Sequence, residues 1–195
     1  YQLGMGDQVS FVLLVMLVMI GAFLIPTKLV ADRLNKGPTY ALGLFIACVP
    51  IMLSFFMPPG QSIWIYVIAA VAGIGFSAQW VCPWSMLPDV IEYDEKLTGE
   101  RREGIYYGMW AFLSKFTNAL GVAVAGWALD AYGYIPNIAQ SVHTLFGIRL
   151  FFAIIPALVI ILSLPFLIWY PITRKKHAAL VQELAQRKAA GEAQP

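Results

Sequence analysis

Long apolar runs separated by short polar stretches constrain this chain more than any other feature of its sequence. The first run, residues 9–30, includes SFVLLVMLVMIGAFLI and has no charged residue before Lys28. A helix rises about 1.5 Å per residue, so about 20 apolar residues cross a hydrocarbon core of about 30 Å. Four further runs lie at residues 40–57, 63–87, 105–129 and 150–170. The pattern predicts an all-α membrane protein with five transmembrane helices.

Charged residues make up only 12% of the chain, whereas a soluble domain has about 25%. This scarcity excludes an ordinary soluble domain and indicates that residues 1–170 form a transmembrane bundle. Residues 171–195 are polar and form a separate tail. Leu180, Val181 and Leu184 fall on one side of that tail, which predicts a short amphipathic helix at the membrane surface.

Proline and glycine mark the expected ends of several spans. Gly37 and Pro38 are expected to break the chain before the second span, and the Pro-Pro-Gly run at 58–60 follows it. Pro83 and Pro88 are expected to break the third span near its end.

Charge is densest in residues 86–108, MLPDVIEYDEKLTGERREGIYYG, which we interpret as a short polar loop between the third and fourth spans. Four acidic residues lie close together there: Asp89, Glu92, Asp94 and Glu95. Such carboxylates could bind Mg²⁺ or Ca²⁺ and serve a membrane enzyme. Three basic residues are interleaved with them: Lys96, Arg101 and Arg102. Ion pairing is therefore the preferred interpretation, and we expect no metal site in this chain.

The basic residues predict an orientation, because cytoplasmic loops carry an excess of Lys and Arg. With five alternating spans, eleven basic residues share one side: Lys28, Arg33, Lys36, Lys96, Arg101, Arg102, Arg174, Lys175, Lys176, Arg187 and Lys188. The other side has only Arg149. The charged stretch and the C-terminal tail are therefore expected in the cytoplasm, in a cell membrane. Five spans fit a six-helix half of a carrier that lacks its first helix.

Lys115 is the strongest functional signal in the chain. It lies about ten residues into the fourth span, hence about 15 Å deep and near the bilayer centre. A charge at that depth costs a few kcal/mol, so the side chain should face a cavity, a substrate or a partner outside this chain. Tyr107 and Asn118 lie on the same helix face. The alternative is a structural lysine that faces a wet cleft without a coupling role.

Trp80 is a second candidate, because an indole ring can stack on the C–H face of a sugar. A tryptophan packed between helices or facing lipid fits its spacing equally well. Trp84, nearer the end of the span, fits an interfacial position better. Gly104, Gly108 and Gly121 of the fourth span would allow close helix packing.

The run MLPDVIEYDEKLTGERREGIYYG, then Lys115, then GYIPNIAQS resembles the glycoside-pentoside-hexuronide:cation symporters, the melibiose-permease branch of the major facilitator superfamily. The resemblance covers essentially the whole chain, as the last five of twelve helices. It implies two six-helix bundles and alternating access, with sugar uptake coupled to Na⁺, H⁺ or Li⁺. It also implies that Lys115 and Trp80 match residues used for coupling and sugar binding. Trp110 and Ala111 replace a polar pair of the melibiose permease, which implies a differently shaped substrate.

The segment KLVADRLNKG resembles a degenerate copy of the superfamily's cytoplasmic loop, with Lys28 and Asn35 where glycines are usual. The resemblance implies a cytoplasmic gate in which opposite charges pair when that side closes. Its candidate residues are Asp32, Arg33, Asp89, Glu92, Asp94, Arg101 and Arg102.

The expected partners are a small sugar or glycoside, a coupling cation, the lipid bilayer and an N-terminal half that would hold most of the cation site. No other cofactor and no nucleic acid are expected. Two alternatives stay open: a lysolipid:cation symporter of the same superfamily, and a metal-dependent membrane enzyme that uses the acidic residues.

Overall fold

The structure is a computed structural model that describes residues 9–57, 62–136, 138 and 140–192. Helices make up nearly all of this part, and it contains no strand: α1 (Val9–Leu34), α2 (Lys36–Ser54), α3 (Ser62–Thr98), α4 (Glu103–Ala131), α5 (Val142–Arg149), the π-helical turn η2 (Leu150–Ile154), α6 (Ile155–Ile168) and α7 (Arg174–Glu192). The turn expected at 58–60, and Asn137 and Ala139 of the PNIAQS run, lie outside the described residues.

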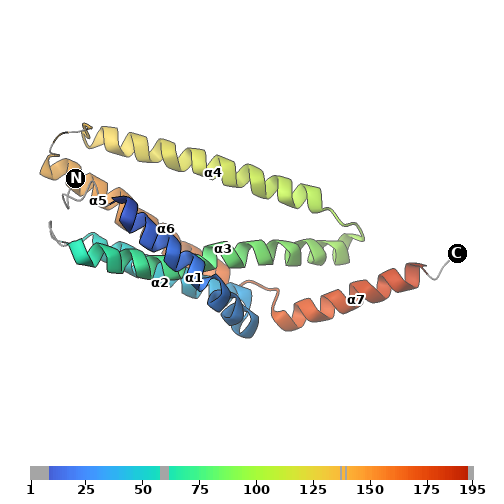
Figure 1. The fold of residues 1–195 in the computed structure, drawn as a ribbon. Coiled ribbons are helices and arrows are strands. Elements are labelled where there is room, and N and C mark those ends of the chain that lie inside the picture. Colours follow the sequence, from blue (N-terminus) through green and yellow to red (C-terminus); the bar gives the residue numbers. More distant parts are fainter. Residues whose placement is uncertain (1–8, 58–61, 137, 139, 193–195) are drawn as a thin grey trace.

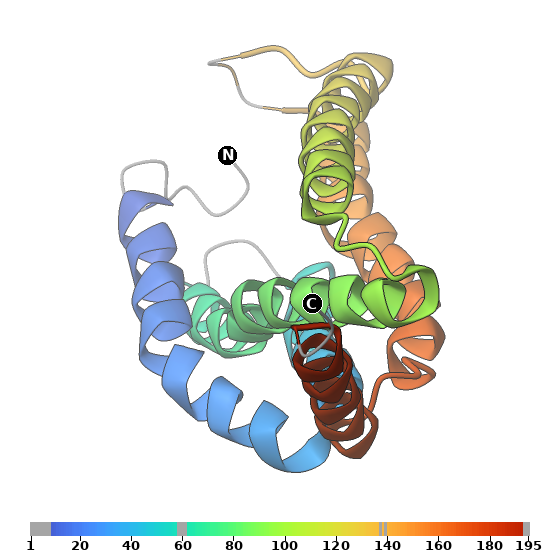
Figure 2. The same cartoon turned by 90° about the vertical axis from the view of Figure 1, so that its right-hand side faces the viewer.

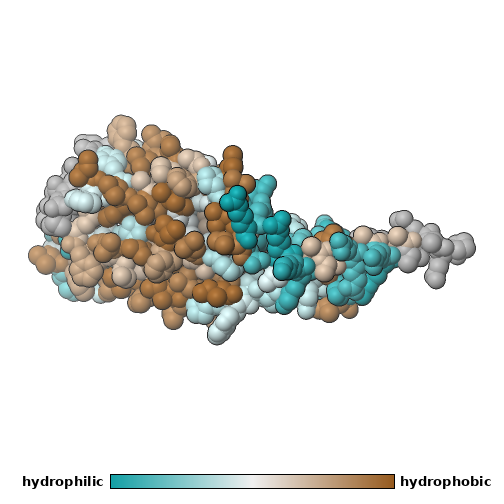
Figure 3. All heavy atoms as spheres, turned by 90° about the horizontal axis from the view of Figure 1, so that it is seen from below, coloured by the Kyte–Doolittle hydropathy of each residue, from teal (hydrophilic) through white to brown (hydrophobic). Residues whose placement is uncertain are grey.

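Five helical stretches of the described residues are long and apolar enough to cross a membrane: Val9–Leu34, Lys36–Ser54, Ile63–Thr98, Glu103–Ala131 and Val142–Ile168. The last combines α5, η2 and α6, so the fifth span begins earlier than residue 150. Apolar side chains cover the flank of the bundle, and polar ones gather towards the α7 end (Figure 3). The prediction of an all-α membrane protein with five spans is confirmed.

Small residues hold α2 and α3 close together at the centre of the bundle. A side chain at Gly75 would collide with the backbone of Gly43 and Ala47. On the other side of α3, Gly73 lies against Met16 of α1. Close backbone approach of this kind is how helices associate in a membrane, where burial of apolar surface gives little driving force.

The π-helical turn of the last span, Leu150–Ile154, lies just before Pro156. Pro156 lacks an N–H, and its ring would clash with the carbonyl of Phe152 in a regular helix. Widening the turn at Leu150–Ile154 relieves that clash without ending the helix.

Two predicted breaks are wrong. Pro83 and Pro88 lie inside α3, which runs on to Thr98, so the polar loop shrinks to residues 99–102. Membrane-spanning helices tolerate proline more readily than soluble ones do. Gly99 ends the helix instead: it has φ 77°, and its N–H donates to the Glu95 carbonyl at 2.8 Å.

The break at Gly37 and Pro38 is also misplaced. Helix α2 begins at Lys36, so Pro38 stands in its first turn, where a missing N–H costs nothing. A single residue, Asn35, turns the chain between α1 and α2, with φ 94°. This is a conformation that few residues other than glycine adopt.

Helix α7 packs on the second half of α3. Leu180 and Leu184 are buried, with exposed fractions of 4% and 8%, whereas Val181 is largely exposed. The tail is helical as expected, and two of its three apolar side chains are buried against the protein.

Helix α4 lies apart from the other spans, along the upper edge of Figure 1. Figure 2 places α1 and α4 on opposite sides of α3. Ala128 is the one buried residue of α4. Gly104, Gly108 and Gly121 face open space, so the close packing expected of them does not occur within this part of the chain.

Candidate functional site

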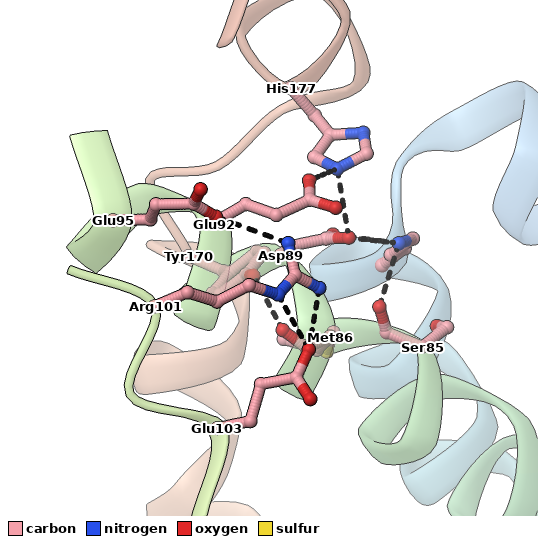
Figure 4. Close-up of polar contacts among 10 residues, drawn as sticks. Ser85, Met86, Asp89, Glu92, Glu95, Arg101, Glu103, Tyr170 and His177 are labelled. Carbon is pink, nitrogen blue, oxygen red and sulfur yellow. Dashed lines mark hydrogen bonds and ion pairs between the residues drawn. The ribbon is translucent and has the colours of Figure 1, made fainter. Parts of the chain in front are cut away.

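Charged side chains gather at one end of the bundle, which we call the polar end. It comprises residues 32–36, the second half of α3, residues 99–103 and α7. Figure 4 shows the contacts that converge there from α2, α3, α4 and the C-terminal segment. Helices α2, α3 and α7 are far apart in sequence, so only the fold brings their side chains together.

Asp89 lies at the centre of the polar end and is 3% exposed. Lys36 Nζ from α2 lies 2.6 and 2.8 Å from its two carboxylate oxygens. The same ammonium donates to the Ser85 carbonyl at 2.8 Å. A buried carboxylate needs such a partner, because an unpaired charge away from water is costly. The pair therefore joins α2 to α3.

His177 of α7 contacts two carboxylates of α3 through one ring nitrogen. Its Nε2 lies 2.7 Å from Glu92 Oε2 and 3.3 Å from Asp89 Oδ1. The two carboxylates are three residues apart and so share a helix face. These contacts fix the start of α7 against α3, beside the Lys36–Asp89 pair.

The loop after α3 is held by two arginines. Arg102 Nε and Nη2 donate to the two oxygens of Asp94 at 3.0 and 2.8 Å. Arg101 bridges Glu95, at 3.1 Å, and Glu103, at 2.6 Å. The hydrogen bond to Glu103 raises the pKa of the Arg101 guanidinium, which therefore stays charged. These contacts fold the loop back on α3.

Asp32 and Arg33 are exposed, and neither side chain forms an ion pair among the residues that the structure describes. The backbone carbonyl of Asp32 instead accepts a hydrogen bond from Arg174 Nη1 at 2.5 Å. Asp32 also lines a cavity of about 220 Å³ together with Asp89 and His177. The structure thus brings Asp32 to the site but does not pair it.

Sequence reasoning named the carboxylates of this site but missed Lys36 and His177. Lys36 entered only as one of the basic residues that set the orientation. Its distance of 53 residues from Asp89 gives no local signal. His177 lies 85 residues from Glu92, so its role likewise depends on where α7 docks.

The expected ion pairing accounts for the acidic residues. Asp89, Glu92, Asp94 and Glu95 all have a basic or histidine partner. Among the described residues, no group of three or more His, Cys, Asp or Glu side chains could hold a metal ion. Cys48 and Cys82 are buried free thiols.

The intramembrane candidates are all exposed in this chain: Trp80, Tyr107, Lys115 and Asn118. No hydrogen bond, ion pair or ring contact joins any two of these four within the described part of the chain. A ring contact between α3 and α4 does occur beside them, with the Trp84 and Trp110 centroids 6.1 Å apart. The structure therefore leaves these four side chains available to a group outside the chain.

Comparison with known proteins gives consistent matches. A family model described as MFS/sugar transport protein matches residues 1–174. An uncharacterized symporter of Synechocystis is 37% identical over 164 residues, 81% of this chain and 30% of that protein. A putative sulfoquinovose importer of Salmonella typhimurium is 34% identical over 175 residues, 89% of this chain and 36% of that protein. A glucuronide carrier protein homolog of Escherichia coli is 31% identical over 160 residues, 80% of this chain and 34% of that protein. The chain spans about a third of the length of these curated relatives.

Proposed function

The chain belongs to the MFS/sugar transport protein family, and from this premise we propose that it forms part of a secondary active transporter for a sugar or glycoside. Transport is coupled to Na⁺ or H⁺ and proceeds by alternating access. The chain supplies the last five of twelve helices, which fits its coverage of about a third of each relative. A second, N-terminal bundle supplies the other wall of the pathway and most of the cation site.

The position and exposure of Lys115 are the observation that carries this proposal. Its side chain is exposed on α4 and has no hydrogen-bond or ion-pair partner among the described residues. Helix α4 buries a single residue, so most of its surface lacks a partner in this chain. A charge at mid-membrane depth that faced lipid would be costly. Lys115 is therefore expected to face the central cavity between the two bundles.

The cargo is best matched by an anionic sugar. One relative is named as a sulfoquinovose importer and another as a glucuronide carrier homolog, and both names describe acidic sugars. The ammonium of Lys115 would pair with the sulfonate or carboxylate in a site of low dielectric. Trp80 would stack on the sugar ring, and Tyr107 and Asn118 would bond its hydroxyl groups.

The polar end is the cytoplasmic gate in this proposal, as the distribution of Lys and Arg indicates. The pairs Lys36–Asp89, Arg102–Asp94 and Arg101–Glu95 hold the C-terminal bundle's side of the gate together. Asp32 and Arg33, which form no ion pair in the described part of the chain, are available to the opposite bundle. Pairs of this kind shift a two-state equilibrium by a few kcal/mol, which suits a gate that must both open and close.

The test is an uptake measurement on the full-length protein in transport-deficient cells. A labelled panel would include sulfoquinovose, a glucuronide and the neutral α-galactoside melibiose, each with and without Na⁺ and a proton uncoupler. We expect uptake of an acidic sugar that Na⁺ stimulates or the uncoupler abolishes. Uptake of melibiose alone would exclude the anionic cargo, and no coupled uptake of any sugar would overturn the proposal.

A further inference from the structure

A pocket between α3 and α7 is lined by none of the residues assigned to the proposed gate or to the cargo pathway. Its volume is about 270 Å³, and its lining includes Tyr93, Lys96, Pro171, Ile172, Lys176 and Leu180. We propose that this pocket binds the headgroup of an anionic phospholipid, such as phosphatidylglycerol. The proposal depends neither on the identity of the cargo nor on its coupling ion.

The charges around the pocket favour an anion. Lys96, which lines the pocket, lies with its Nζ 2.6 Å from Glu183, and Glu183 also pairs with Arg187 Nη2 at 2.8 Å. Lys176 adds a third positive charge, and its exposed side chain has no ion-pair partner among the described residues. Two lysines, Lys96 and Lys176, thus line the pocket, and only Lys96 has a carboxylate partner among the described residues. A phosphate group would compensate the excess and accept hydrogen bonds from both lysines.

The walls of the pocket favour a lipid over a soluble anion. Ile172 and Leu180 are 8% and 4% exposed and form an apolar floor beside the lysines. Tyr93, which is 49% exposed, contributes an aromatic ring with a polar tip. A phospholipid presents a charged phosphate next to an apolar glycerol ester and acyl chains. The pocket has the same division between polar and apolar surface.

The position of the pocket along the chain also fits the headgroup layer. Pro171 and Ile172 follow directly on Trp169 and Tyr170, which come just after the last transmembrane helix. Trp169 is 79% exposed. Tryptophan and tyrosine concentrate at the level of the lipid headgroups, and basic residues beside them attract anionic lipids. The two lysines are thus placed within reach of lipid phosphates.

The chain offers a matched control for the test. Lys175 and Lys176 are adjacent and both exposed, but only Lys176 lines the pocket. The variants Lys176→Gln and Lys175→Gln therefore remove the same charge at almost the same place. The full-length protein would be purified in detergent, and the retention of phosphatidylglycerol and phosphatidylcholine would be compared by native mass spectrometry.

We expect the wild-type protein and K175Q to retain phosphatidylglycerol in preference to phosphatidylcholine. We expect K176Q to bind phosphatidylglycerol about fivefold more weakly, as the loss of one lysine contact at a membrane surface implies. Equal weakening in K175Q and K176Q would reduce the effect to general surface charge and overturn the proposal. Displacement of the lipid by millimolar glycerol 3-phosphate or inorganic phosphate would overturn it too, because the site would then serve a soluble anion.

Discussion

Asp89 has partners on two other helices, Lys36 of α2 and His177 of α7. Its carboxylate is almost completely buried, so its charge is tolerated only while these partners remain. Asp89 of α3 therefore connects α2 and α7 at the polar end.

We predict that Lys36→Met destabilises the full-length protein by about 3 kcal/mol, because it leaves the Asp89 carboxylate buried without its ammonium partner. The double variant Lys36→Met/Asp89→Asn should recover part of the loss, since no uncompensated charge then remains. Thermal unfolding in detergent measures both. A double variant whose loss equals the sum of the two single losses would contradict the pairing, because independent residues show additive effects.

Asn35 is the second residue whose conformation matters. With φ 94° it adopts a conformation that costs a residue other than glycine about 1–3 kcal/mol. Its Oδ1 accepts the N–H of Arg174 at 3.0 Å and so caps the start of α7. The superfamily loop that KLVADRLNKG resembles usually has glycine here. In this chain the hydrogen bond from the Arg174 N–H to Asn35 Oδ1 offsets the strain of the positive φ.

Asn35→Ala should therefore be clearly more destabilising than Asn35→Gly, by about 1–3 kcal/mol. Alanine keeps the strain and loses the cap, whereas glycine loses the cap but relieves the strain. Denaturation midpoints of the two full-length variants provide the comparison. Equal stability of the two variants would show that the positive φ carries no strain.

At the scale of elements, α7 is fastened to α3 by exposed as well as buried contacts. The hydrogen bond from Lys96 lowers the pKa of the Glu183 carboxyl below its ordinary value of 4.5. A carboxyl with a lowered pKa stabilises the docked state at neutral pH and loses that effect as the pH falls through its shifted value.

We accordingly predict that the far half of α7 stays docked between pH 7 and pH 5 and loosens only below pH 4.5. Spin labels at the exposed positions Leu97 and Gln186 would report the distance between α3 and α7. In Glu183→Gln the distance should no longer depend on pH in this range. Loosening already at pH 6 in the wild-type protein would contradict the assignment of the effect to Glu183.

Glycines divide the helices into those packed within the chain and those open to a partner. Gly75→Val should prevent correct folding, because the added atoms would meet the backbone of α2. Gly121→Val adds the same atoms where nothing lies within 4 Å in this chain. We predict that Gly121→Val inserts normally but lowers uptake, because the proposed N-terminal bundle would pack there. Expression level and uptake distinguish the two, and normal uptake by Gly121→Val would place that face against lipid.

At the scale of the whole molecule, the spans could be predicted because membrane thickness fixes how many apolar residues a helix needs. The extent of α3 could not, since Pro83 and Pro88 usually end helices and here do not. The acidic residues of the site were found because they are dense in sequence. Their partners Lys36 and His177 were not, because docking of α2 and α7 on α3 depends on contacts between segments far apart.

Close packing around α4 could not be predicted either, because it too depends on contacts with other segments. Its exposed surface, with Lys115 at its middle, has little to pack against in a chain that spans about a third of its relatives. The central proposal is that Lys115 meets the cargo in a cavity shared with a second bundle. It must therefore be tested in the full-length protein.

The most direct test is coupled uptake by full-length Lys115→Ala, with Lys175→Ala as a control that removes an exposed lysine outside the spans. We predict that Lys115→Ala reaches the membrane in normal amounts but loses gradient-driven accumulation of an acidic sugar at least a hundredfold, on the order of 3 kcal/mol. Lys175→Ala should transport normally. Accumulation by Lys115→Ala at the wild-type level would contradict the proposal, because Lys115 would then serve neither binding nor coupling.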